Sequence, residues 1–281
     1  MAVVRSSDSL LREGTRRLAR VSESARLDCE LLLAHALGLD RTALYARPAQ
    51  ELPSGEVERF ETLLAERMRG RPLAQIVGRK EFHSLEFEIT DEVLVPRPET
   101  ELLVEVVREG VRAKGGNPRI LDLGTGSGAV AVALARTLPE SQVVASDVSR
   151  AALAVARRNA ARLAPGQVRF VQGSWYGPLD GRRFDAIACN PPYVESLLCG
   201  EPPLCFEPRQ ALDGGPDGVR QLRLAIAGAP AHLNRGGMLA AEHGADQGAP
   251  VRSLMCSAGL EAAITHRDLA GRERVTAARM P

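Results

Sequence analysis

The residues best suited to chemistry are Asn190, Pro191, Pro192 and Tyr193, which directly follow the apolar run FDAIAC at 184–189. Proline fixes φ and lacks a backbone N–H, so the chain is held stiffly at this point. A strand end followed by a Pro-Pro turn is one explanation of the segment. The other is chemical. The side-chain oxygen of Asn190 and the carbonyl of Pro191 can each accept one hydrogen of a planar NH2 group, while the ring of Tyr193 lies against it.

Methyl transfer is a reaction that would benefit from such a site. The lone pair of a planar NH2 group is delocalised, which makes its nitrogen a poor nucleophile. Two rigid acceptors would hold the group in plane and aim its remaining lone pair at an incoming methyl group. Both hydrogen bonds would strengthen as positive charge develops on the nitrogen, so they would favour the transition state over the ground state. The segment therefore indicates the class of nucleophile but does not select the substrate.

A second chemical signal is the turn LDLGTGSGA at 121–129, in which every second residue from Gly124 to Gly128 is glycine. Read as G-x-G-x-x-A, it fits a dinucleotide fingerprint, with Asp147 at a workable distance for a ribose hydroxyl. Read from Asp122 as D-x-G-x-G-x-G, it fits the S-adenosylmethionine loop of class I methyltransferases. A purely structural turn is a third possibility, because glycine suits any tight turn.

The segment that begins at Asn190 decides between the two cofactors, because hydride transfer has no use for it. In a doubly wound sheet, ligands bind at the carboxyl edge where the order of the strands reverses. The fourth strand lies beside the first in such sheets, so Asn190 would face the cofactor across this crevice. We therefore predict that the cofactor is S-adenosylmethionine.

The elements that must position these residues begin near residue 117. The short apolar runs lie at 119–123, 142–147, 167–173, 184–189 and 236–244. Because helical patterns separate most of these runs, they predict βαβ units and a parallel sheet. A last alternating run at 273–280 predicts a late edge strand. The expected fold is α/β, with the Rossmann-like sheet of a class I methyltransferase.

The first part of the chain is helical in pattern, from Ser9 to about Arg69. In the stretch ARLDCELLLAHALGL, the predicted inward stripe consists of Leu27, Leu31, Ala34 and Leu37. A later helix is predicted to start at a Ser54 cap and to stop at Gly70.

The residues between the two patterns read as a connector. EFHSLEFEIT at 81–90 alternates like a short hairpin, and a helix is predicted to begin near Glu99 after two prolines. We therefore predict a small all-helical domain at 1–80, a hairpin linker at 81–95 and the methyltransferase domain at 96–281.

Composition limits the remaining possibilities. The 281 residues are 44% hydrophobic and 25% charged, and 36 basic against 35 acidic side chains leave a net charge of +1. These values are typical of soluble globular proteins and lack the basic excess of a sequence-independent nucleic-acid binder. The five cysteines form no C-x-x-C pair and the five histidines have no ligand spacing, so we expect free thiols and no metal site. The chain shows neither a membrane-length apolar run nor a leader with an apolar core, and we expect a cytoplasmic protein.

Nearly the whole chain resembles one family, the bacterial protein-(glutamine-N5) methyltransferases of peptide-chain release factors. The similar stretches are LLLAHALGLDR (31–41), RPLAQIVGRKEF (71–82), VLVPRPETE (93–101), ILDLGTGSGAVAVALA (120–135), NPPY (190–193), FEPRQALDGGPDG (206–218), GGMLAAEHGADQG (236–248) and RDLAGRERV (267–275). A huge class shares the glycine loop. The combination of PRPETE, NPPY and FEPRQALDGGPDG is far more particular.

The resemblance implies roles for the candidate residues. Contacts to S-adenosylmethionine would come from Gly124, Thr125, Gly126, Ser127 and Gly128, with Asp147 at the ribose hydroxyls, Trp175 at the adenine and Asn190 at the methyl group. Asn190, Pro191, Pro192 and Tyr193 would bind the substrate glutamine of a GGQ motif, with Asn190, Pro191 and Tyr193 as the catalytic residues. The residues alone leave Trp175 open as a core side chain, and leave Asp147 open as a cap for a helix that begins near Ser149.

The same resemblance implies that the helical unit docks the release factor, and we expect a monomer that uses no membrane. The chain departs from the family at Ser174, where an acid is common, and in the segment 194–205, which is shorter and contains cysteines. An adenine-N6 nucleic-acid methyltransferase is an alternative, but the first 95 residues lack the basic and aromatic interleaving of a target-recognition segment. We therefore expect no direct nucleic-acid substrate. A non-catalytic cofactor-binding module of the translation machinery is the other alternative.

Overall fold

The computed structural model describes residues 5–46, 51–112 and 116–281, and the chain divides into two compact units, Met1–Arg79 and Lys80–Pro281. Residues 1–4, part of the stretch inspected for a leader, lie outside the described residues. Within the described ranges, no helix combines the length and the apolar character that a membrane crossing requires.

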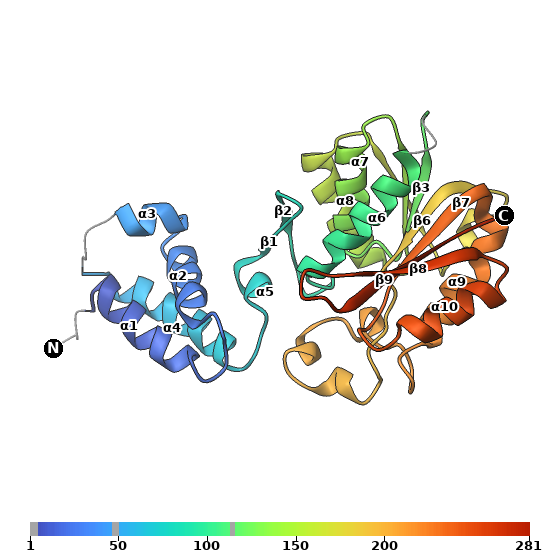
Figure 1. The fold of residues 1–281 in the computed structure, drawn as a ribbon. Coiled ribbons are helices and arrows are strands. Elements are labelled where there is room, and N and C mark those ends of the chain that lie inside the picture. The colour runs from blue at the N-terminus through green and yellow to red at the C-terminus, as the bar shows by residue number, and fades with distance from the viewer. Residues whose placement is uncertain (1–4, 47–50, 113–115) are drawn as a thin grey trace. The chain divides into compact units, whose positions relative to one another are not determined.

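The first unit is a small bundle of helices (Figure 1). Its members are α1 (Ser7–Leu18), α2 (Ala25–Ala36), α3 (Arg41–Ala46), α4 (Ser54–Met68) and α5 (Leu73–Val77). Leu10, Leu18, Phe60 and Leu64 are buried in one core with the apolar side of α2. The all-helical pattern expected for this part of the chain is thus present.

The inward side of α2 differs from the predicted stripe. Leu27 is 40% exposed, whereas Leu32 and Leu33 are fully buried. The reason is that α2 packs against α1, α4 and α5, so its buried side is too broad for a single i, i+4 stripe to mark.

The Ser54 cap is also wrong. Pro53 occupies the N-cap position with an extended ψ of 146°, and Ser54 is the first helical residue. Because the backbone carbonyl of Pro53 accepts from the N–H of Glu56 and Val57, no serine side chain is needed at this end.

The expected hairpin spans the boundary between the two units in the sequence and consists of β1 (Arg79–Phe82) and β2 (Leu85–Glu88). The 3-10 turn η1 (Pro98–Thr100) then leads into α6 (Glu101–Arg112), close to the predicted start at Glu99.

A seven-stranded sheet forms the centre of this unit. Its strands are β3 (Arg119–Leu123), β4 (Gln142–Asp147), β5 (Val168–Gln172), β6 (Phe184–Cys189), β7 (Leu233–Glu242), β8 (Glu261–Arg267) and β9 (Glu273–Arg279). Their order is β5-β4-β3-β6-β7-β9-β8, with the first five strands parallel and β9 antiparallel to both β7 and β8. The predicted Rossmann-like α/β sheet is confirmed.

The sequence prediction missed one strand and misplaced another. The run at 273–280 is β9, which lies between β7 and β8 instead of at the edge. The edge is β8, whose pairing with β9 is interrupted by register shifts. Such an irregular, mostly exposed strand has no clean two-residue period to reveal it.

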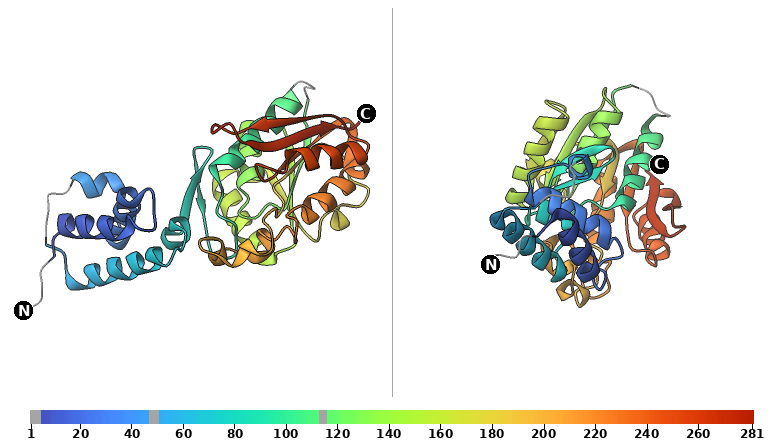
Figure 2. Two further views of the ribbon diagram at one scale, coloured as in Figure 1. Left: turned by 60° about the horizontal axis from the view of Figure 1, so that its bottom comes forward. Right: turned by 90° about the vertical axis from the view of Figure 1, so that its left-hand side faces the viewer.

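Helices cover both faces of the sheet (Figures 1 and 2). On one face lie α6, α7 (Ala129–Thr137) and α8 (Arg150–Leu163), and on the other lie α9 (Arg220–His232) and α10 (Gly248–Ser257). Leu121, Ile187 and Leu239, from three neighbouring strands, share a core with Leu222 and Val251 of the helices α9 and α10. This packing holds the carboxyl ends of β3 and β6 side by side.

Candidate active site

A pocket of about 830 Å³ opens at the carboxyl edge of the sheet. Leu123, the last residue of β3, pairs with Cys189, the last residue of β6, so the glycine turn and the NPPY segment leave the sheet together. Both line the pocket, as predicted for the switch point of a doubly wound sheet.

The glycine turn is held in a conformation that other residues rarely adopt. Gly124, Gly126 and Gly128 have φ values of 82°, 55° and 84°. A Cβ added at Gly124 or Gly126 would meet no atom within 4 Å, whereas one at Gly128 would lie 3.2 Å from the Cα of Ala156. The first two glycines therefore leave the backbone open toward space, and the third permits close packing against α8.

Asp122 holds the glycine turn in place through two hydrogen bonds. Its carboxylate accepts from the hydroxyl of Thr125 at 2.6 Å and from the backbone N–H of Ala131 at 3.0 Å. Burial raises its pKa to about 7, although these two donors favour the ionised form. Asp122 thus binds its own loop and the first turn of α7.

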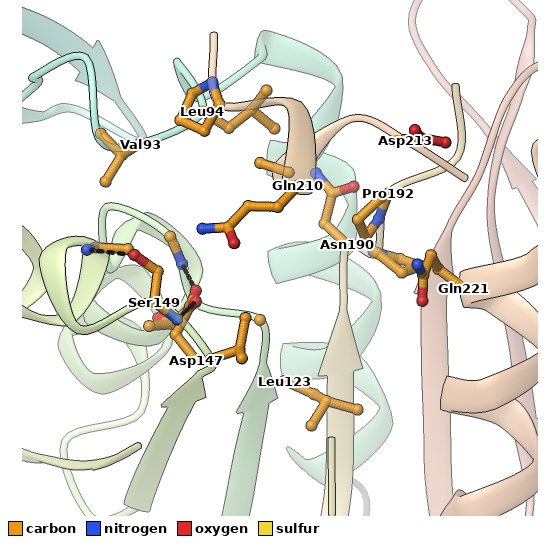
Figure 3. A pocket seen from close by; sticks show the side chains of 18 of the residues that line it. Val93, Leu94, Leu123, Asp147, Ser149, Asn190, Pro192, Gln210, Asp213 and Gln221 are labelled. Atoms are coloured by element: carbon orange, nitrogen blue, oxygen red, sulfur yellow. Dashed lines mark hydrogen bonds between the residues drawn. The ribbon is translucent and has the colours of Figure 1, made fainter. Parts of the chain in front are cut away.

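Asp147 ties the glycine turn to the next strand. One carboxylate oxygen accepts from the N–H of Gly126 at 2.9 Å and the other from the N–H of Ser149 at 2.8 Å. Burial raises its pKa. The N-cap of α8 is Ser149, whose hydroxyl accepts from the N–H of Ala152, so the alternative of Asp147 as the helix cap is wrong. Figure 3 shows both side chains at the pocket wall.

The position of Trp175 is compatible with both roles that the residues left open. It is half-buried against the sheet core and also lines the pocket, next to Ser174. Its φ of 46° is unusual for a large side chain and marks a strained position.

Asn190 stands at the opposite wall of the pocket (Figure 3). Its side-chain Nδ2 donates to the hydroxyl of Thr100 at 3.2 Å. This bond uses the nitrogen end of the amide, so its oxygen is left for another partner. Pro191 and Pro192 line the pocket beside it.

Tyr193 does not line the pocket, although stacking on the acceptor was expected of it. Its ring packs against the sheet core and its hydroxyl donates to Oε1 of Glu242 at 3.1 Å. Burial and the neighbouring carboxyl of Glu242 raise the pKa of Tyr193. The ring therefore holds the NPPY segment by its contacts with the sheet core, on the side away from the pocket.

The segment that follows NPPY pairs with the stretch ALDGGPDG. Val194 donates its N–H to the carbonyl of Leu212 at 2.9 Å and accepts from the N–H of Gly214 at 2.8 Å. A Cβ at Gly214 would lie 2.4 Å from the carbonyl oxygen of Gly218. The same Cβ would lie 2.8 Å from the Cα of Tyr193, so glycine is required where these two segments meet.

Two further stretches are joined by Glu207, which is buried. Its carboxylate accepts from the N–H of Val95 at 2.8 Å and pairs with Arg97. This contact brings PRPETE and FEPRQALDGG, which are distant in sequence, to the same side of the pocket.

Comparison with known proteins agrees with this arrangement. The family model of the PrmC N-terminal domain matches residues 9–78, and that of the methyltransferase small domain matches residues 98–199. A release factor glutamine methyltransferase from Xylella fastidiosa is 45% identical over 97% of this chain and 98% of its own length. One from Vibrio cholerae is 41% identical over 96% of this chain and 95% of its own. The chain belongs to the release factor glutamine methyltransferase family.

Among solved structures, a ribosomal protein L11 methylase from Lactobacillus delbrueckii has a TM-score of 0.52 and 20% identity. It covers 69% of this chain and 84% of its own chain, and the likeness supports the fold.

The sequence reasoning assigned no role to several residues of this family member that hold the site together. Thr100, Glu207 and Glu242 are buried partners of the pocket segments. All three lie within the stretches PRPETE, FEPRQALDGG and GGMLAAEHG, which carried the resemblance, so those stretches were the available signal.

Gln210, in the short turn η5 (Arg209–Ala211), was also missed. Figure 3 shows its side-chain amide pointing into the pocket. No sequence pattern would have placed an exposed glutamine of a 3-10 turn there.

Proposed function

We propose that this enzyme transfers the methyl group of S-adenosylmethionine to the side-chain N5 of the glutamine in the GGQ motif of peptide-chain release factors. The observation that carries the proposal is the amide of Asn190, whose nitrogen is bound to Thr100 in the wall of a pocket that also contains the glycine turn. An oxygen held in this way is an acceptor for the NH2 group of a second amide.

For the cofactor, we assign the turn from Gly124 to Gly128, including Thr125 and Ser127, to the methionine end and the ribose of S-adenosylmethionine. The open space at Gly124 and Gly126 supports this assignment. The carboxylate of Asp147 keeps lone pairs beyond its two backbone partners, as a pair of ribose hydroxyls requires. We assign the ring of Trp175 to the adenine. Bound S-adenosylmethionine supplies an electrophilic methyl carbon.

The side-chain oxygen of Asn190 and the carbonyl of Pro191 each accept one hydrogen bond from the NH2 group of the substrate glutamine. The group is then held in plane, and the lone pair on its nitrogen points at the methyl carbon. Methyl transfer would form the N–C bond and break the S–C bond of the bound donor, and the extra proton on nitrogen would pass to water. Both acceptors stabilise the positive charge while it exists. Pro192 keeps them rigid.

We assign Tyr193 to positioning instead of direct contact, because its hydroxyl is engaged by Glu242 outside the pocket lining. The helical unit is assigned to release-factor docking, which its match to the PrmC N-terminal domain supports. Since release factors act on ribosomes, we place the reaction in the cytoplasm. We also propose that the enzyme is a monomer.

The test is methylation with labelled S-adenosylmethionine, offering purified release factors, DNA and RNA in parallel. We expect label on release factors alone, at the glutamine of the GGQ peptide identified by mass spectrometry. Label on adenine in DNA or RNA would replace the proposal with the nucleic-acid alternative. Cofactor binding without label on any substrate would favour the non-catalytic module.

A further inference from the structure

A fully buried carboxylate lies behind the pocket, and methyl transfer as described above does not use it. Glu242 is the last residue of β7 and has no exposed surface. Oε1 accepts from the hydroxyl of Tyr193, whereas Oε2 makes no hydrogen bond of full geometry within the described residues. Burying a charge with incomplete partners is unfavourable, so a group of this kind calls for an explanation.

Thr100 lies between this carboxylate and the pocket. It is 4% exposed, and its hydroxyl accepts from Nδ2 of Asn190 at 3.2 Å. The same hydroxyl interacts with Glu242 and lowers the pKa of that carboxyl. Thr100 thus bonds to the amide at the pocket wall and lies close enough to the buried acid to affect its pKa, although no hydrogen bond of full geometry joins the two.

The order of donors follows from the chemistry of the three groups. A hydroxyl has one proton, and an ionised carboxylate can only accept. An ionised Glu242 would therefore attract the proton of Thr100, which would leave the lone pairs of the hydroxyl for the NH2 end of Asn190. In the reverse orientation, the NH2 of Asn190 would face the NH2 of the acceptor, and no hydrogen bond could form between them.

We propose that Glu242 and Thr100 are positioning residues that make the oxygen of Asn190, and not its nitrogen, face the acceptor amide. The inference rests on the methyl transfer proposed above. It adds which residues set the orientation of the Asn190 amide for that reaction. Tyr193 completes the arrangement, because the same carboxylate fixes the far end of the NPPY segment.

The arrangement makes turnover depend on pH. Burial raises the pKa of Glu242 and Glu99 contributes in the same direction, whereas Thr100, Tyr193 and Arg274 lower it, so that the pKa is about 7. The thiol of Cys189 on β6 also interacts with this carboxyl, which raises the pKa of the thiol. Below pH 7 the carboxyl is protonated and can itself donate to Thr100. The hydroxyl proton is then free to turn toward Asn190, so the orientation of the amide is no longer enforced.

The experiment compares the intact protein with Glu242→Gln, Thr100→Val and the matched control Thr100→Ser. For the first two we expect kcat on a GGQ peptide to fall on the order of 10-fold, the equivalent of one lost hydrogen bond. The Kd for S-adenosylmethionine should change less than about twofold. Thr100→Ser keeps the hydroxyl and should retain most of the turnover. The wild-type kcat, measured at saturating cofactor, should fall as the pH drops through 7, and Glu242→Gln should remove that transition.

An unchanged kcat in both Glu242→Gln and Thr100→Val would overturn the proposal. So would equal losses in Thr100→Ser and Thr100→Val, since these would indicate packing alone.

A second readout does not need activity. The NMR signals of the Asn190 side-chain NH2, assigned with Asn190→Ala, should titrate near pH 7 in the wild type and not in Glu242→Gln. If the wild type methylates no release factor, the proposed function fails, and this titration still decides whether the pair positions Asn190. A flat titration in the wild type would overturn the positioning role.

Discussion

The side-chain nitrogen of Asn190 lies 3.2 Å from the hydroxyl of Thr100, which joins the end of β6 to the start of α6. The two residues are 90 positions apart in the sequence. Because the bond involves the nitrogen, the amide of Asn190 is available to the pocket as an acceptor. A site for an NH2 group requires this asymmetry, whereas a simple strand-ending turn does not.

Replacing Asn190 by Ala should therefore damage turnover far more than cofactor binding. The change removes one of two acceptors that strengthen as charge develops, and we expect kcat to fall on the order of 10²–10³-fold. Mass spectrometry of the GGQ peptide after reaction measures the loss. Near-normal methylation by this variant would mean that NPPY serves only as a turn.

Replacing Gly126 by Val should abolish binding of S-adenosylmethionine. Gly126 has a φ of 55°, which a β-branched residue adopts only with strain, and an added side chain would extend into open space at the pocket. Gly166→Val is the matched control, because Gly166 has a φ of 76° with similarly open space but does not line the pocket. Calorimetry should show binding to the control and none to Gly126→Val, with NAD bound by neither. Loss of binding in both variants would indicate general strain.

A chain that begins at Lys80 should retain the chemistry and lose affinity for its protein substrate. Among the described residues, those that line the pocket lie between Glu92 and Gln221, all within the second unit. We expect unchanged kcat on a GGQ peptide and a higher KM for whole release factor, since a docking unit supplies substrate affinity instead of chemistry. An unchanged KM for the whole protein would remove the docking role from this unit.

Gln210 should compete with the acceptor for space in the pocket. Its amide points into the cavity that must admit a glutamine side chain (Figure 3), so Gln210→Ala should lower KM for the peptide severalfold without raising kcat. Gln210→Met fills similar space without an amide and should leave KM near the wild-type value. A higher KM in the alanine variant would instead show that Gln210 helps to bind the substrate.

Several features of the molecule could be predicted from the sequence because their causes are local. The alternation of apolar strands and amphipathic helices after residue 117 requires only neighbouring side chains, and it predicted the parallel part of the sheet. Glycines at 124, 126 and 128 predicted a tight turn, and all three have the positive φ that glycine adopts most readily. Two prolines directly after β6 predicted a rigid segment at the carboxyl edge.

Other features depended on contacts between distant segments, and only the tertiary structure decided them. The packing of α2 on several neighbours buries Leu32 and Leu33 instead of Leu27. The insertion of β9 between β7 and β8 requires antiparallel pairing across the sheet. The direction of Tyr193 is set by Glu242, which lies 49 residues later, and that of the Asn190 amide by Thr100, which lies 90 residues earlier. In each case several partners of similar chemistry were available to the residue or strand. Which one it contacts depends on which segments lie close together in the folded chain.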